Sequence, residues 1–126
     1  MKLKTVMVIK ALVCLTLGVP ILLMPVFTYS LFGIDLDSEG VYPAWQYGAA
    51  LIGNMLLTWF ARNAVDSDAR RAIILALCIY DAIGLVLTLI ALFTGSLGIL
   101  GWFAVVIYLF FTLGFGYFLL PQKKAA

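Results

Sequence analysis

The chain of 126 residues contains no histidine and only two cysteines. Without histidine it lacks the commonest metal ligand, the usual axial ligand of haem, and the usual general base. Cys14 and Cys78 are far apart in the sequence, so they form no Cys-x-x-Cys pair, which speaks against a thiol–disulfide oxidase. The chain also has no phosphate-binding glycine loop, no nucleophile elbow and no repeated acidic metal motif. We therefore expect no enzyme activity, no bound metal and no cofactor.

Charged residues are also scarce, at 11% of the chain, whereas hydrophobic residues make up 65%. Soluble domains are about half apolar and a quarter charged, so this composition is typical of an integral membrane protein. Four apolar stretches are long enough to cross a bilayer, over residues of about 5–31, 42–62, 71–95 and 100–120. The sequence predicts one all-α domain, 1–126, in which four transmembrane helices form an up-down-up-down bundle.

The basic residues are grouped near the N-terminus, at the central turn and in the C-terminal tail. They are Lys2, Lys4, Lys10, Arg62, Arg70, Arg71, Lys123 and Lys124. By the positive-inside rule, both termini and the central turn are predicted to be cytoplasmic. We expect these side chains to contact lipid headgroups and not nucleic acid.

The first apolar stretch contains a lysine and two prolines. Lys10 lies about one turn inside the stretch, and its long stem predicts that the ammonium extends outward to the interface. Pro20 and Pro25 each lack a backbone donor, so they predict a bend in the outer half of this segment.

One carboxylate and one amide lie deep in the apolar stretches. At a rise of about 1.5 Å per residue, Asn54 lies about 12 Å and Asp81 about 15 Å from the central turn, so we expect them to face each other. An Asp at a helix centre costs on the order of 3 kcal/mol, which a hydrogen bond would offset. A protonated Asp81 could donate to Asn54 or to the hydroxyl of Thr58, Tyr108 or Thr112.

Small residues recur at helical spacing along three of the predicted helices. Ala49 and Gly53 are four residues apart, and Gly84, Gly101 and Gly116 lie on similar stripes of small and hydroxyl-bearing residues. Since burying leucine gains little in lipid, such stripes predict helix–helix contacts.

Asp81 also allows a functional interpretation, in which it is a proton or cation site on a water-filled path. Small multidrug resistance transporters are four-helix proteins of similar length with an essential membrane carboxylate. Here the acid lies in the third predicted helix and not the first, and the one-sided basic bias disfavours a dual-topology dimer.

Several segments resemble a group of small, uncharacterised four-helix proteins of the bacterial inner membrane. These segments are Leu31-Phe-Gly-Ile-Asp35, Gly48-Ala-Ala-Leu-Ile-Gly53, Trp59-Phe-Ala-Arg-Asn63, Ser67-Asp-Ala-Arg-Arg-Ala72 and Leu113-Gly-Phe-Gly-Tyr-Phe118. The resemblance covers most of the chain and implies a location in the bacterial cytoplasmic membrane. It assigns no site residues.

The sequence thus favours a non-catalytic membrane protein that acts as an accessory subunit of a larger membrane complex or as a small homo-oligomer. The alternative is a small proton- or cation-coupled transporter or channel that uses Asp81. Binding of a pigment, quinone or lipid without histidine ligands also remains an open alternative, although no motif predicts it.

Overall fold

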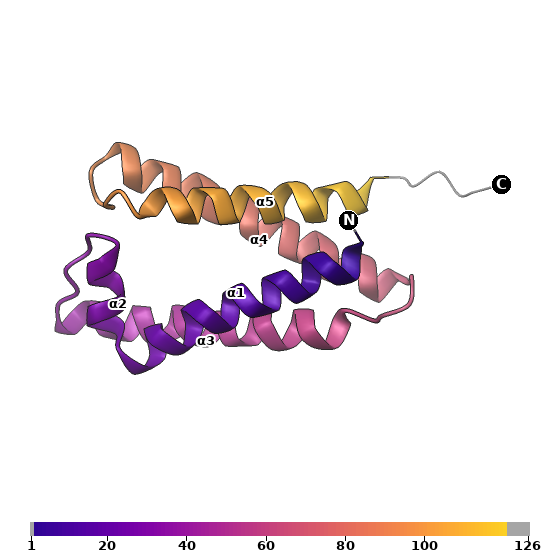
Figure 1. Ribbon diagram of the computed structural model, residues 1–126, viewed down its shortest axis with the longest axis horizontal. Coiled ribbons are helices and arrows are strands. Elements are labelled where there is room, and N and C mark those ends of the chain that lie inside the picture. Colours follow the sequence, from indigo (N-terminus) through magenta and orange to yellow (C-terminus); the bar gives the residue numbers. More distant parts are fainter. Residues whose placement is uncertain (1, 121–126) are drawn as a thin grey trace.

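The computed structural model describes residues 2–120, which form five helices (Figure 1). They are α1 (Leu3–Leu23), α2 (Pro25–Leu31), α3 (Ser38–Ala61), α4 (Asp68–Phe93) and α5 (Gly101–Leu119). The prediction of an all-helical protein is confirmed. Lys123 and Lys124, which contributed to the predicted orientation, lie outside the described residues.

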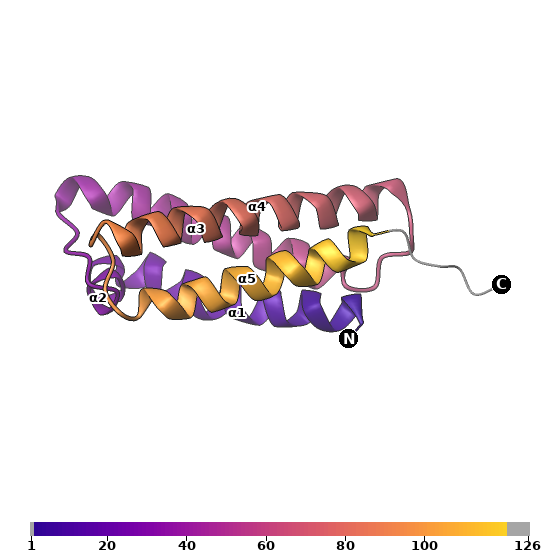
Figure 2. The ribbon, with the colours of Figure 1, turned by 90° about the horizontal axis from the view of Figure 1, so that it is seen from above.

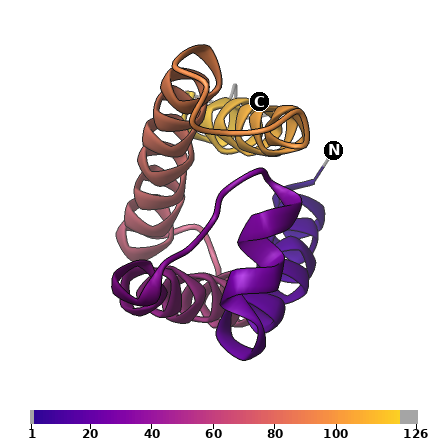
Figure 3. The ribbon, with the colours of Figure 1, turned by 90° about the vertical axis from the view of Figure 1, so that its left-hand side faces the viewer.

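The four long helices run alternately in opposite directions, so that the start of α1 and the end of α5 lie at the same end as the α3–α4 turn (Figures 1 and 2). The helices form two pairs, because α1 packs along α3 and α4 packs along α5. Contacts between α1 and α5 are fewer, and α3 and α4 make almost none although they are consecutive. Viewed from the end that carries α2, the two pairs surround a central region (Figure 3).

Three helices, α1, α4 and α5, are long and apolar enough to cross a membrane. This supports a membrane protein and accounts for three of the four predicted spans. Helix α3 has 24 residues, but it is less apolar than the other three because polar side chains such as Gln46 and Asn54 interrupt it.

The first predicted helix, 5–31, is divided in two at Met24. Pro25 begins α2, and its ring disfavours helical geometry at the preceding residue, where φ is −139° and ψ is 66°. Pro20 stays inside α1. The predicted bend is therefore present, and it is a break next to Pro25.

Two helices begin earlier than predicted because a polar side chain caps each of them. The Asp37 carboxylate accepts a hydrogen bond of 2.7 Å from the Gly40 amide at the start of α3, and the Ser67 hydroxyl accepts one of 3.2 Å from the Arg70 amide at the start of α4. The expected starts at residues 42 and 71 were too late by one turn. At the C-terminal ends, the expected and observed bounds differ by at most two residues.

Different contacts join the two helix pairs at each end of the bundle. At the end with the α3–α4 turn, a buried cluster includes Met7 of α1, Leu77 of α4, and Phe111 and Phe115 of α5. At the opposite end, the Gly98 amide donates a 2.7 Å hydrogen bond to the Phe32 carbonyl. Gly33, with φ of 78°, lies so close that a Cβ there would stand 3.0 Å from the Gly98 nitrogen.

The small residues of the predicted stripes have different surroundings. A Cβ on Gly84 would lie 2.5 Å from the Tyr108 ring, one on Gly101 would meet Leu97 and Leu92, and one on Gly116 would lie 3.7 Å from the Cys78 sulfur. These three glycines therefore lie at contacts of α4, α5 and the loop between them. Ala49 and Gly53 do not make the expected helix contact, because both are exposed and a Cβ on Gly53 meets nothing within 4 Å. The face of α3 that packs on α1 instead carries Gly48.

Gly84→Ala is predicted to destabilise the α4–α5 pair by about 1–3 kcal/mol, since the added methyl group overlaps the Tyr108 ring. Gly53→Ala is the matched control in open space, where alanine stabilises a helix by up to about 1 kcal/mol. Unfolding in mixed micelles, followed by circular dichroism, measures both. Equal free energies of unfolding for the two variants would contradict the close α4–α5 contact.

Candidate functional site

A buried ion pair lies in the interior of the bundle. The Lys10 ammonium of α1 donates to the Asp81 carboxylate of α4 at 2.5 Å, and the two residues are 3% and 0% exposed. Two expectations are thereby corrected, because Lys10 does not extend to the interface and Asp81 does not bond to Asn54. The depths of these residues were predicted from their positions along the backbone. The long side chain of Lys10 carries its ammonium well away from its own Cα, so it can reach a carboxylate at another depth.

The position of Lys10 follows from the buried face of α1. Met7, Lys10 and Cys14 are spaced by three and four residues, so they lie on one stripe of the helix, and all three are buried. A lysine on the stripe that packs inward can reach a partner inside the bundle. This spacing is the signal in the sequence that could have identified Lys10 as the partner of Asp81.

Aromatic rings surround the ammonium. The Lys10 nitrogen lies 5.1 Å from the centroid of the Tyr80 ring and 4.9 Å from that of Phe111. Such faces attract cations and offset part of the cost of removing the charge from water. The second carboxylate oxygen of Asp81, Oδ2, is buried and has no hydrogen-bond partner among the described residues.

The other proposed partners of Asp81 form different bonds. The Thr58 hydroxyl donates to the backbone carbonyls of Asn54 and Met55, and the Thr112 hydroxyl donates to the carbonyl of Tyr108. The amide side chain of Asn54 is on α3, which makes almost no contact with α4. Asp81 bonds to Lys10 and not to Asn54, although Asn54 and Asp81 both lie deep in their helices.

A cavity of about 440 Å³ lies between the two helix pairs, and Lys10 is part of its wall. It extends along α1 from Lys10 to Ile21, about 16 Å at 1.5 Å per residue. Its wall is predominantly apolar and includes residues of all five helices. The apolar part includes Val13, Leu17, Ile21, Leu51, Leu87, Leu100, Phe103, Ala104, Ile107 and Phe111.

Four tyrosines, one each from α2, α3, α4 and α5, supply most of the polar groups of the wall. The hydroxyls of Tyr47 and Tyr108 form a hydrogen bond of 2.6 Å. Tyr29 and Tyr80 lie close enough to Tyr47 to interact with it electrostatically. The Tyr80 hydroxyl is buried close to Tyr47, but it forms no hydrogen bond of normal geometry within residues 2–120. Of these four residues only Tyr108 was predicted as a site residue, because the four come together only through the packing of the helix pairs.

Within the described part of the chain, no three histidine, cysteine, aspartate or glutamate side chains gather into a group that could hold a metal ion. Both cysteines are free thiols, and the Cys78 sulfur lies 3.6 Å from the Thr112 carbonyl. The groups available for binding at the cavity are therefore the phenols and the ammonium. Comparisons with protein-family models, curated proteins and solved structures gave no match.

The variants Lys10→Met and Asp81→Asn are each predicted to destabilise the protein by on the order of 3–5 kcal/mol, because each leaves its former partner buried without a counter-charge. The double variant is expected to recover most of this loss, since it buries no charge. The free energy of unfolding in mixed micelles measures the cycle, with Lys4→Met at an exposed position as the control. Additive losses in the double variant would contradict the direct pair.

Proposed function

We propose that this protein is a non-catalytic integral membrane protein that binds an apolar small molecule in the cavity between its two helix pairs. The cavity itself is the observation that carries the proposal. Small-molecule sites typically measure about 300–1,000 Å³ and are lined by apolar and aromatic side chains with a few polar groups that orient the ligand. The cavity has this size and this kind of wall.

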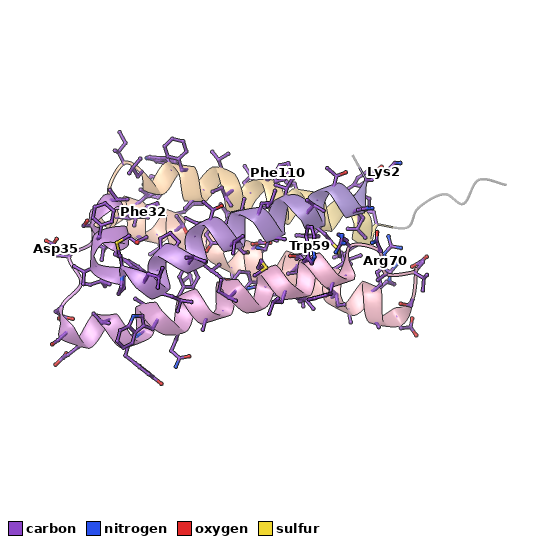
Figure 4. All side chains as sticks on the ribbon, turned by 60° about the horizontal axis from the view of Figure 1, so that its bottom comes forward. Lys2, Phe32, Asp35, Trp59, Arg70 and Phe110 are labelled. Carbon is purple, nitrogen blue, oxygen red and sulfur yellow. The ribbon has the colours of Figure 1, made fainter. Side chains whose placement is uncertain are left out.

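The proposed architecture has four transmembrane helices, with α3 as the fourth, and both ends of the chain in the cytoplasm of a bacterium. Its support is that α3 packs along the apolar α1, and that Lys2 and Arg70 lie at the opposite end of the bundle from Asp35 (Figure 4).

In a cysteine-free background, a membrane-impermeant thiol reagent added outside should label Asp37→Cys and not Asp66→Cys. The reverse labelling pattern would contradict this orientation.

The protein could perform this binding as an accessory subunit of a larger membrane complex or as a small homo-oligomer. The exposed face of α3 with Ala49 and Gly53 supports such an association, because small residues allow close approach of another helix in lipid. Proteins that remain bound after gentle purification distinguish a complex from self-association.

A proton- or cation-coupled transporter is the second candidate, and the presence of the buried Lys10–Asp81 pair is the observation that raises it. Ionisable residues inside a membrane often mark proton or ion pathways, and Lys10 also borders the cavity. In proteoliposomes with a pH-sensitive dye, a transporter should carry protons that the double variant Lys10→Met/Asp81→Asn does not carry. The binding proposal instead expects the same slow proton leak from both proteins.

Protein purified gently from native membranes is predicted to retain an apolar small molecule in a stoichiometric amount. Ala104→Phe should abolish this retention because the ring occupies the cavity, whereas Val106→Phe on the exposed face of the same helix should not. Mass spectrometry of an organic extract measures the retained molecule, and circular dichroism verifies that both variants are folded. Identical extracts from both variants would place the bound molecule outside the cavity and contradict the proposal.

A further inference from the structure

We infer that the ligand of the cavity is an uncharged, lipid-soluble molecule of the quinone class, whose carbonyl oxygen accepts a hydrogen bond from the Tyr80 hydroxyl. This inference rests on the proposed function and specifies the chemistry of its ligand.

The wall of the cavity has an excess of hydrogen-bond donors. The Tyr80 hydroxyl is buried and makes no hydrogen bond of normal geometry among residues 2–120, and the neighbouring Tyr47 hydroxyl already shares a hydrogen with Tyr108. A buried hydroxyl in this state is costly unless something accepts its hydrogen. The Tyr47 and Tyr108 hydroxyls share one hydrogen in their mutual bond, which leaves the other available. The Lys10 ammonium has three hydrogens, and Asp81 Oδ1 accepts one of them.

The hydroxyl groups of the two threonines in the wall already donate their hydrogen bonds to backbone carbonyls. The Thr28 hydroxyl donates to the Met24 carbonyl and the Thr88 hydroxyl to the Gly84 carbonyl, each at 2.7 Å. The free groups of the cavity are therefore mainly the phenols and the ammonium, so the complementary ligand is rich in acceptors and needs no donor. Carbonyl oxygens satisfy this requirement.

The charge of the cavity wall also favours an uncharged ligand. The only cation that lines the cavity, within the described residues, is Lys10, and the Asp81 carboxylate neutralises it at 2.5 Å. A carboxylate or phosphate headgroup would add a negative charge to a site that is neutral and buried, which is unfavourable without a counter-charge. An uncharged acceptor avoids this cost.

The size and shape of the cavity fit a ring that carries an apolar chain. Its volume of about 440 Å³ is about three times that of a cavity of about 150 Å³ that binds benzene. The donors of Lys10 and Tyr80 are neighbours, since the ammonium lies 5.1 Å from the Tyr80 ring. From this point the apolar wall continues to Leu97 and Ile34 near the opposite end of the bundle. A ring with carbonyl groups would bind at the Lys10 end, and an apolar chain would extend along the rest.

The experiment uses the full chain in nanodiscs and three probes with the same decyl chain, namely a decyl benzoquinone, decylbenzene and decanoate. The rise of the unfolding temperature with probe concentration gives each affinity. We expect the quinone to bind about tenfold more tightly than decylbenzene, and decanoate to bind more weakly than the quinone. Tyr80→Phe should weaken quinone binding about five- to tenfold, as loss of one hydrogen bond implies, and leave decylbenzene unchanged. Tyr42→Phe, at an exposed position of α3, is the matched control.

The possible failures are distinguishable. If the quinone and decylbenzene bind equally and Tyr80→Phe has no effect, carbonyl recognition is overturned while binding of an apolar ligand stands. If decanoate binds most tightly, the argument from charge is wrong and the site selects anions. If no probe binds better to the wild type than to Ala104→Phe, both this inference and the proposed function fail.

Discussion

The Lys10–Asp81 ion pair is the interaction on which the arrangement of this bundle depends. Lys10 belongs to the α1–α3 pair and Asp81 to the α4–α5 pair, so this buried ion pair joins the two halves, together with the contacts at the two ends of the bundle and the Tyr47–Tyr108 hydrogen bond. In lipid, apolar helix faces gain little by meeting each other, and a directional contact therefore has a large influence on which faces meet. The alternative of leaving either charge unpaired is unfavourable by several kcal/mol, so few other registers of the two pairs compete with this one.

The cavity follows from the way in which the two pairs meet. They contact each other through Phe111 and Phe115 at one end and through the Gly98–Phe32 hydrogen bond at the other. Between these ends, small side chains such as Ala91 and Ala104 line the interior and leave the central region unfilled by the chain itself. The cavity opens to the surface beside the exposed side chains of Leu87 and Phe103, and its volume between the pairs is the basis of the proposed ligand binding.

The sequence predicted local features well and tertiary features poorly. Composition predicted an all-helical membrane protein and Pro25 predicted the bend, because each of these effects acts locally or depends on residue content alone. The pairing of α3 with α1 was not predictable in this way. A short turn between α3 and α4 fixes only their ends, so Asn54 and Asp81 can lie at similar depths in consecutive helices and still be separated. The spacing of Met7, Lys10 and Cys14 along one face of the first helix was visible in the sequence. It predicts an ion pair with Asp81 only when the length of the lysine side chain is also considered.

The pairing of the two charges also bears on the choice between binding and transport. A carboxylate that takes up and releases protons during a transport cycle changes its charge at each step. Here protonation of Asp81 would leave the ammonium of Lys10, 3% exposed and held against Tyr80 and Phe111, without its counter-charge. This contact between the two helix pairs would weaken at the same step. A buried pair of this kind is better suited to a constant neutral wall beside a ligand than to a repeated change of charge.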